Sequence, residues 1–293
     1  MRSAKTKIRP YLMVAPAMAG LLLFTVYPIF RLIQLSLTDV NMLDKTKSKF
    51  VGFRNFQQIF VRPDFRQALS NTLVYTVAVV FLISALSLVF AVWLNSTKSR
   101  LNNLLQGMIF FPNIVSIVSV SLVWLWMMEP TYGLFNYVLR SLSLPTLQWL
   151  SSSQTAMPSV ILVSVWKSVG YDTLIYLAAL QSVSPSIYEA ASLDCKNKFT
   201  IFFKITLPMI SPLLFFTLII RVIDSFKMFD TVRVMTEGGP NNATMTLVYE
   251  IYNEALQNVR IGYSSAIGVV LLIIISVLTL GYFKLYAKKV HYQ

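Results

Sequence analysis

The sequence contains a single cysteine, Cys195, and a single histidine, His291, in 293 residues. One cysteine excludes an internal disulfide framework and any site that needs several cysteine ligands. One histidine beside the C-terminus argues against histidine-based metal binding or acid–base chemistry. The chain also lacks the G-x-x-x-x-G-K-[ST] loop that cradles nucleotide phosphates and any Ser-His-Asp constellation. The sequence therefore predicts no catalytic residue, no metal site and no cofactor in this chain.

Charged residues are also scarce. They make up 13% of the chain, whereas 56% of its residues are hydrophobic, and a soluble domain carries about 25% charged residues. A single soluble core cannot absorb this much apolar sequence, so the lipid bilayer is the expected solvent. The net charge of +13 does not indicate a nucleic-acid partner, because Lys and Arg fall mostly between the apolar segments, where they contact lipid headgroups.

Long apolar segments dominate the chain and predict an all-α, polytopic membrane protein of about six transmembrane helices, each of roughly 20 residues. The predicted spans are Tyr11–Leu37, Leu69–Leu94, Gly107–Met128, Pro158–Ser182, Pro212–Met235 and Ile261–Tyr286. The first is too long for a signal peptide and is interpreted as a retained helix. With no repeat and no separate soluble segment, we expect one transmembrane domain over residues 1–293, with a core at about 69–286.

The distribution of Lys and Arg favours a cytoplasmic N-terminus and a cytoplasmic C-terminus, because the segments then placed inside hold more of these residues than the outer loops do. The loop Thr38–Ala68 departs from this rule. Within it, Phe50–Phe65 is partly amphipathic, with apolar side chains at Phe53, Phe56, Ile59 and Phe60. This segment either lies along the outer membrane surface or forms an ordinary packed loop.

The loop between the fourth and fifth predicted spans, about residues 184–212, has the pattern of two short helices. Pro185 suits the first turn of one helix, and Glu189 lies near its positive end. An apolar patch of Phe199, Phe202 and Phe203 precedes Pro208, which is expected to end the second helix. The pattern fits either a docking element for another protein or a helical hairpin resting on the membrane.

The fifth span carries ionisable residues of alternating sign: Arg221, Asp224, Lys227, Asp230 and Arg233. Such groups are costly within a membrane and face protein or a water-filled path. Steps of three residues spiral around a helix, so these five cannot share one face, although neighbours of opposite charge can pair.

One stripe does follow a single helix face: Arg221, Asp224, Ser225, Met228 and Val232. We predict that it faces a translocation path, and ion pairs that only fix helix packing are the alternative.

The fourth span adds Lys167, Tyr171 and Asp172. Lys167 and Tyr171 are four residues apart and share a helix face. Aromatic rings stack on the apolar faces of sugars, and charged groups bind sugar hydroxyls. These residues either bind a substrate or, as Trp166 and Tyr171 also allow, pack against neighbouring helices.

The 184–212 loop resembles the EAA motif of the permease subunits of ABC importers, which reads Glu-Ala-Ala, a Gly after the Asp, and then Ile-x-Leu-Pro. The matching residues are Glu189, Ala190, Ala191, Asp194, Ile205, Leu207 and Pro208. Cys195 stands where the family has Gly, a residue that permits a positive φ in the turn. The resemblance implies that this loop docks into an ATP-hydrolysing subunit and transmits its closure to the membrane helices.

Further motifs resemble the carbohydrate-uptake branch of these permeases, the maltose-type importers. They are Pro130–Asn136, Val165–Tyr171, Leu177–Gln181, Phe226–Asp230, the Gly238-Gly239-Pro240 turn and Gly262–Ala266. The resemblance implies a sugar substrate, a path lined by residues of the fourth span, and a bacterial inner-membrane location. It also implies four kinds of partner: a second, non-identical permease, a pair of ATP-binding cassette subunits that bind ATP and Mg, an external solute-binding protein, and the bilayer.

Three alternatives remain open from the sequence. A glycerol-phosphate or other anionic sugar-derivative importer has the same architecture, and Arg221 and Lys227 favour an anion unless Asp224 and Asp230 neutralise them. An ion-coupled secondary transporter would use these carboxylates but often shows inverted repeats. An intramembrane enzyme would need convergent catalytic groups, which the sequence does not show.

Overall fold

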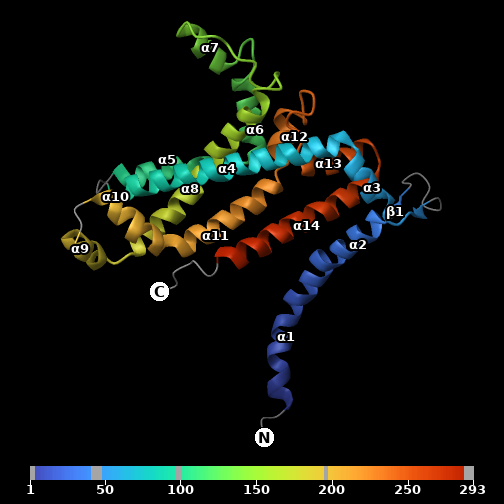
Figure 1. Ribbon diagram of the computed structural model, residues 1–293, viewed down its shortest axis with the longest axis horizontal. Helices are drawn as coiled ribbons and strands as arrows, with labels where there is room; N and C mark the ends of the chain where they lie inside the picture. Colours follow the sequence, from blue (N-terminus) through green and yellow to red (C-terminus); the bar gives the residue numbers. More distant parts are fainter. Residues whose placement is uncertain (1–3, 41–47, 97–100, 195–196, 287–293) are drawn as a thin grey trace. The chain divides into compact units, whose positions relative to one another are not determined.

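The computed structural model describes residues 4–40, 48–96, 101–194 and 197–286 (Figure 1). It is helical almost throughout and divides into two compact units. The first unit comprises Met1–Pro63 with Glu250–Ile273, and the second comprises Asp64–Tyr249 with Ile274–Gln293. Cys195 and His291 lie outside the described residues.

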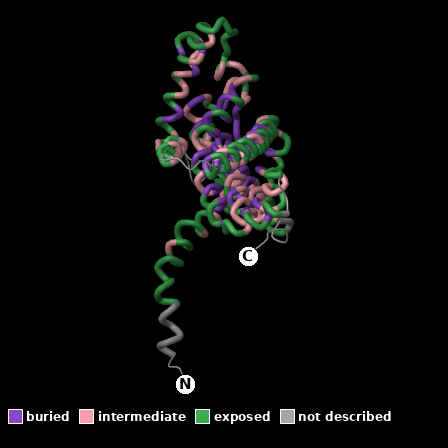
Figure 2. The backbone as a smooth tube through the Cα atoms, turned by 90° about the vertical axis from the view of Figure 1, so that its left-hand side faces the viewer, coloured by how far each residue is buried: buried purple, intermediate pink, exposed green. Residues whose placement is uncertain are grey.

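The first unit begins with a helical segment made of α1 (Ala4–Leu21), the π-helical turn η1 (Leu22–Val26) and α2 (Tyr27–Ser36). Its apolar stretch, Tyr11–Ser36, is long enough to cross a membrane, and no residue of its 18-residue apolar window is buried within the chain (Figure 2). An apolar helix with no buried face is stable only where lipid or another protein covers it. This segment confirms the predicted first span.

A short antiparallel pair, β1 (Thr38–Asp39) and β2 (Lys49–Phe50), leads into α3 (Arg54–Val61). Asn55 donates to the carbonyl oxygens of Ser36 and Thr38 at 2.8 and 3.0 Å. Ile59 is fully buried, whereas Phe53 and Phe60 are exposed. The predicted amphipathic segment is thus a helix that packs by one face on its own unit, and its relation to the membrane surface stays a prediction.

Buried charge ties the first unit together. Glu254, in the π-helical turn η4 (Asn253–Gln257), accepts ion pairs from Arg62 at 3.1 Å and from Arg260 at 3.3 Å. The same two guanidinium groups lie over the ring of Tyr263, at 5.1 and 4.9 Å from its centroid. Two arginines around one buried carboxylate fix the first turn of α14 (Ile261–Tyr286).

The second unit contains the remaining helices. In chain order they are α4 (Pro63–Ser96, whose first residue belongs to the first unit), α5 (Leu101–Ile114), α6 (Ile117–Met127), α7 (Leu134–Ser141), α8 (Ala156–Ser182), α9 (Pro185–Asp194), α10 (Lys198–Ile201), the π-helical turn η3 (Phe202–Thr206), α11 (Leu207–Phe226), α12 (Asp230–Met235) and α13 (Leu247–Tyr252). The end of α13 belongs to the first unit, and the end of α14 belongs to the second.

Among the described residues, five helices are long and apolar enough to cross a membrane, and a bent pair brings the count to six. The bent pair corrects the predicted continuous span Gly107–Met128, because α5 and α6 meet at an angle of 95°. Ser116 has an extended backbone (φ −54°, ψ 135°), so the helical hydrogen-bond ladder stops there.

The predicted span Pro212–Met235 is also interrupted. Helix α11 ends at Phe226, and α12 starts only at Asp230, after Lys227 (φ −91°, ψ 9°) and Phe229 (φ −140°, ψ −56°) leave helical geometry. The predicted stripe from Arg221 to Val232 crosses this break, so Val232 lies beyond it in α12, and the translocation path along this stripe stays a prediction.

Pro208 was expected to end a helix, and that expectation is wrong. It lies in the first turn of α11, directly after the π-helical turn η3. The helix is continuous here, because Thr206 before α11 has helical geometry (φ −60°, ψ −53°). A local π-helical adjustment is one way in which a membrane helix accommodates the hydrogen bond that proline cannot make. Pro28 follows η1 in the same way, so both spans pass through a proline without stopping.

The segment between α6 and α8 folds as a small lobe around Asn136. The Asn136 amide donates to the carbonyl oxygens of Pro130 and Leu147 and accepts from the Leu147 N–H and the Trp149 indole, all within 3.1 Å. Gly133 is required because a Cβ there would lie 2.3 Å from the Glu129 carbonyl oxygen. The Pro130–Asn136 motif is thus a folding signature of this lobe.

Two apolar cores flank the middle of α8. One, near the lobe, contains Val120, Met128, Val163 and Met235. The other, near α9, contains Ala91, Leu94, Tyr176, Leu177, Leu180 and Ile210, with Ile187 and Tyr188 of α9 packed against it. The stretch of α8 between these cores carries its two charged residues, Lys167 and Asp172.

Helices α5 and α8 approach most closely at Gly170, where an added Cβ would lie 2.0 Å from the Ile109 carbonyl oxygen. We predict that Gly170→Ala forces the helices apart and lowers the free energy of unfolding by about 1–3 kcal/mol. Gly107→Ala, on α5, meets nothing within 4 Å and is the matched control. Thermal unfolding followed by circular dichroism on the purified chain measures both, and equal midpoints for the two variants would contradict the prediction.

Candidate functional site

Five of the charged residues named in the fourth and fifth spans line one pocket of about 220 Å³ in the second unit. Its walls come from α4, α8, the start of α6, the end of α11 and the break before α12. The lining residues are Tyr75, Val79, Ile83, Ile117, Ser164, Lys167, Ser168, Arg221, Asp224, Ser225, Lys227, Met228, Phe229, Asp230 and Thr231. The break between α11 and α12 supplies Lys227, Met228 and Phe229, so the pocket exists because α11 does not continue.

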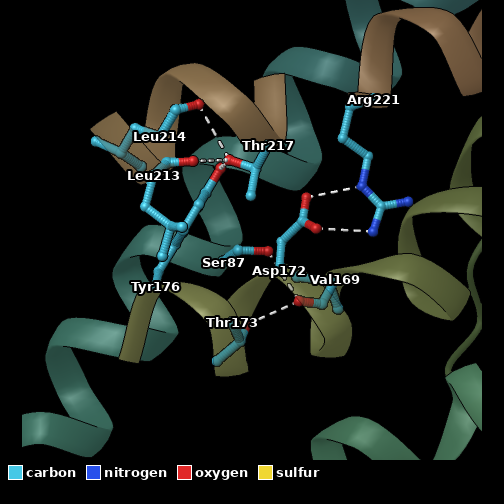
Figure 3. Close-up of polar contacts among 9 residues, drawn as sticks. All are labelled: Ser87, Val169, Asp172, Thr173, Tyr176, Leu213, Leu214, Thr217 and Arg221. Carbon is cyan, nitrogen blue, oxygen red and sulfur yellow. Dashed lines mark hydrogen bonds and ion pairs between the residues drawn. The ribbon is translucent and has the colours of Figure 1, made fainter. Parts of the chain in front are cut away.

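A buried ion pair between α8 and α11 forms one wall. The Nε and Nη2 of Arg221 donate to the two carboxylate oxygens of Asp172 at 2.8 and 2.7 Å (Figure 3). The Asp172 side chain is only 1% exposed and that of Arg221 14%. The Arg221 guanidinium also lies 5.5 Å from the ring centroid of Tyr171. This two-point contact fixes the orientation of the guanidinium as well as its position.

The expected partner of Arg221 within its own helix, Asp224, is instead 3.4 Å from Lys227, and both of these side chains are about half exposed. Asp172 was named from the sequence as part of the fourth span but was not assigned to the site. A spacing argument along one helix could not have found it, because the pair joins residues 49 positions apart.

Two further contacts hold the same helices close to the pair. The Thr217 hydroxyl on α11 donates to the Tyr176 hydroxyl on α8 at 3.1 Å, and Ser87 on α4 donates to the carbonyl oxygen of Val169 at 2.8 Å (Figure 3). Polar links between apolar helices are favoured in a membrane because water is not available to replace them. Helices α4, α8 and α11 therefore form one fixed frame around the pocket.

Lys167 enters the pocket wall from α8, but its ammonium group is directed at backbone. It donates to the carbonyl oxygens of Val115 at 2.7 Å and of Pro112 and Asn113 at 3.3 Å, at the bend between α5 and α6.

Of the predicted path residues, Lys167, Arg221, Asp224, Ser225 and Met228 line the pocket. Tyr171 does not line it and instead lies against Arg221. Sequence reasoning missed Tyr75 on α4 and Ser164 on α8. Ser164 precedes Lys167 by three residues, so the two share a face of the helix, and this spacing could have predicted Ser164 as a pocket residue. Nothing in the sequence predicts Tyr75 as a pocket residue, because its position depends on how α4 packs.

The predicted docking loop joins α8 to α11. Its two short helices lie together at the ends of those long helices (Figure 1). Glu189 and Ala190 are exposed, while Ala191 is 7% exposed. Leu193 and Phe199 are 89% and 77% exposed, which leaves large apolar side chains uncovered on this surface.

The other motif residues of the loop frame the second helix. Asp194 ends α9, and Cys195 lies outside the described residues. Asn197 caps α10 by accepting from the Phe199 N–H at 3.0 Å. Ile205 belongs to the π-helical turn η3, and Leu207 and Pro208 begin α11. The apolar end of the motif is thus part of a membrane helix.

Within the part of the chain that the structure describes, no group of three or more His, Cys, Asp or Glu residues is placed to hold a metal ion. A pocket lined by both charged and apolar side chains between apolar helices, together with an exposed helical loop at the ends of two of them, is typical of a polytopic membrane transport component.

The comparisons with known proteins identify the family. Residues 83–292 match the model described as "Binding-protein-dependent transport system inner membrane component", and the chain belongs to this family, the permease subunits of ABC importers. This membership rules against the secondary transporter and the intramembrane enzyme considered from the sequence.

Two curated relatives cover nearly the same length. The sn-glycerol-3-phosphate transport system permease protein UgpA of Rhizobium meliloti is 31% identical, over 98% of this chain and 97% of the relative. The arabinooligosaccharides transport system permease protein AraP of Halalkalibacterium halodurans is 32% identical, over 94% of this chain and 86% of the relative.

A crystal structure of a bacterial alginate ABC transporter contains a chain with the same fold. Its TM-score to this chain is 0.86, at 24% identity, with 97% of this chain and 96% of that chain covered.

The buried pair can be tested by removing one partner. Arg221→Met leaves the Asp172 carboxylate buried and unpaired, and we expect the free energy of unfolding to fall by about 3–5 kcal/mol. Asp172→Asn combined with Arg221→Met removes both charges and recovers part of this loss. Lys227→Met breaks the half-exposed pair with Asp224 and is expected to change stability by at most about 1 kcal/mol.

Thermal unfolding of the purified chain measures the three variants. If Arg221→Met unfolds at the same temperature as Lys227→Met, the buried pair does not hold α8 to α11.

Proposed function

We propose that this chain forms the translocation path of an ATP-driven importer for a sugar or oligosaccharide delivered by an external solute-binding protein. The pocket carries this proposal, because membrane helices place charged, hydroxyl and aromatic side chains around one small space. The substrate path residues are Lys167, Arg221, Asp224, Ser225 and Met228, with Tyr171 supporting Arg221.

A neutral sugar fits the pocket better than a sugar phosphate. Two of the three cations that line it are already engaged, Arg221 by the Asp172 carboxylate and Lys167 by backbone carbonyls. The third, Lys227, has Asp224 beside it. Phosphate binding calls for cations that are not neutralised by protein groups. The relatives include permeases named for either substrate, so the pocket charge is the observation that favours the neutral one.

The proposed assembly has this chain in a heterodimer with a second permease, a pair of ATP-binding cassette subunits inside, and the binding protein outside. The chain itself does not hydrolyse ATP, and ATP and Mg belong to the partner subunits. The lobe at one end of α8 and the α9–α10 loop at the other are separated by 27 helical residues, or about 40 Å, which exceeds the hydrocarbon thickness. They therefore belong on opposite sides of the membrane.

The loop is proposed to be the cytoplasmic one, which places the N- and C-termini inside and the chain in the bacterial inner membrane. Its chemistry fits a protein partner. Phe199 in α10 and Phe203 in η3 are exposed, and Glu189 is exposed on α9. Aromatic residues are enriched in protein interfaces. Ala191 packs on this chain while Ala190 is exposed, so the two alanines serve different sides of the same helix.

Charge reversal tests the docking role. We expect Glu189→Lys to abolish co-purification of the ATP-binding cassette subunits, because it reverses a charge on the exposed face of α9. The structure corrects the expected position of Glu189 near the positive end of its helix: Glu189 lies beyond the first turn of α9, which holds no acidic residue. The helix dipole acts mainly within the first turn, so the loss must come from the partner contact. Glu237→Lys reverses an exposed carboxylate beyond α12 and is the matched control. Normal assembly and transport in Glu189→Lys would contradict a docking role for the loop.

Reconstitution tests the substrate and the energy source. In proteoliposomes that contain both permeases and the ATP-binding cassette subunits, we expect uptake of a neutral oligosaccharide to require ATP and the binding protein. Uptake of glycerol phosphate is expected to stay at the level of empty vesicles. Uptake driven by an ion gradient without the ATPase subunits would overturn the proposed mechanism, and efficient phosphate-ester uptake would overturn the substrate class. The ligand of the binding protein, measured by calorimetry, then identifies the sugar.

A further inference from the structure

The bend between α5 and α6 leaves backbone carbonyls without helical partners. The last carbonyl groups of a helix lack N–H donors, and within a bilayer no water replaces them. A bend of 95° inside a membrane protein therefore needs a group that satisfies these oxygens.

Lys167 supplies that group. Its Nζ lies 2.7 Å from the Val115 oxygen and 3.3 Å from those of Pro112 and Asn113. An ammonium has three N–H donors and no acceptor, so three carbonyl oxygens match its full capacity. Its charge also lies at the end of α5, where the helix dipole is negative.

A second contact from the same face of α8 holds α5 one turn before the bend. Gly170 follows Lys167 by three residues and brings the backbone of α8 against Ile109, within van der Waals distance of its carbonyl group. Helix α5 is thus held at Ile109 by backbone contact and at its last residues by the ammonium. The residue directly after the bend, Ile117, lines the pocket.

We propose that Lys167 is a positioning residue, which holds the α5–α6 bend and thereby sets the pocket wall at Ile117. It acts through the chain's own backbone and does not bind the transported molecule. The proposal rests on the proposed function in one respect, that the pocket is the transport path. The geometry of the bend can be measured without reference to transport.

Spin labels on the two arms report the bend. Leu104 on α5 and Val123 on α6 are 60% and 56% exposed and lie about 15 and 9 Å from the bend. Both are changed to cysteine in a Cys195→Ser background of the assembled transporter, and double electron–electron resonance gives the distance distribution. Lys167→Met is expected to broaden it towards longer distances, because unsatisfied carbonyls favour straightening. Lys167→Arg, with five donors, is expected to keep it narrow.

Lys227→Met is the matched control, since it removes a lysine from the same pocket but has no contact with the bend in the described structure. Its distance distribution should equal that of the unsubstituted protein. Transport should fall about tenfold or more in Lys167→Met, as the loss of charged hydrogen bonds implies, and should be largely restored in Lys167→Arg.

An unchanged distribution in Lys167→Met overturns the proposal, and a loss of transport with it would assign Lys167 to substrate binding. A broadened distribution with normal transport supports the proposal and counts against the pocket as the path. If Lys167→Met does not assemble, the distance distribution is measured on Lys167→Gln, whose amide reaches fewer carbonyls. A broadened distribution in this variant supports the proposal, and an unchanged one overturns it.

Discussion

A charged side chain can remain within a membrane helix only if another group of the protein replaces its water, and the Arg221–Asp172 pair meets this condition most completely here. Both carboxylate oxygens of Asp172 are bound, and the pair is almost fully shielded. An unpaired arginine at the centre of a transmembrane helix costs at least about 2.5–3.5 kcal/mol of insertion free energy. Because each charge needs the other as its partner, the pair fixes how α8 and α11 are aligned along their lengths at Asp172 and Arg221. The polar contacts of Tyr176 and Thr217 then form beside it.

The same rule explains why the pocket lies at helix breaks. Ending a helix in lipid leaves carbonyl groups without hydrogen-bond donors, and at each break a side chain from another segment donates to them. Lys167 does so at the α5–α6 bend. At the α11–α12 break, Thr246 donates to the Met228 carbonyl oxygen at 3.1 Å. Irregular backbone at membrane depth is tolerated where protein covers it or where it lines a cavity. Breaks, polar side chains and a pocket therefore occur together between the two apolar cores of the second unit.

Hydropathy predicted the spans well, since each apolar segment of about 20 residues became a helix or a helix pair. It could not predict the bends, because local propensity does not reveal that Lys167 would bind carbonyls some 50 positions away. The sequence predicted most of the charged residues that line the pocket, but it did not predict which of them form ion pairs. Arg221 and Asp224 are a helical turn apart and pair plausibly by spacing, yet the tighter partner, Asp172, comes from another helix. Ion pairs between helices depend on how the helices pack against each other, and this packing cannot be deduced from a single sequence.

The frame around the pocket and the exposed loop share their helices. Helix α8 runs from Lys167 and Asp172 to the turn before α9, and α11 runs back from the loop to Arg221. The loop is not loosely attached, because Ile187 and Tyr188 of α9 pack on the core that includes Leu180 of α8 and Ile210 of α11. Packed cores transmit displacement because they resist compression. In the proposed docking role, a displacement of α9 would reach α8 and α11 through this shared core, and the Arg221–Asp172 pair joins the same two helices at the pocket.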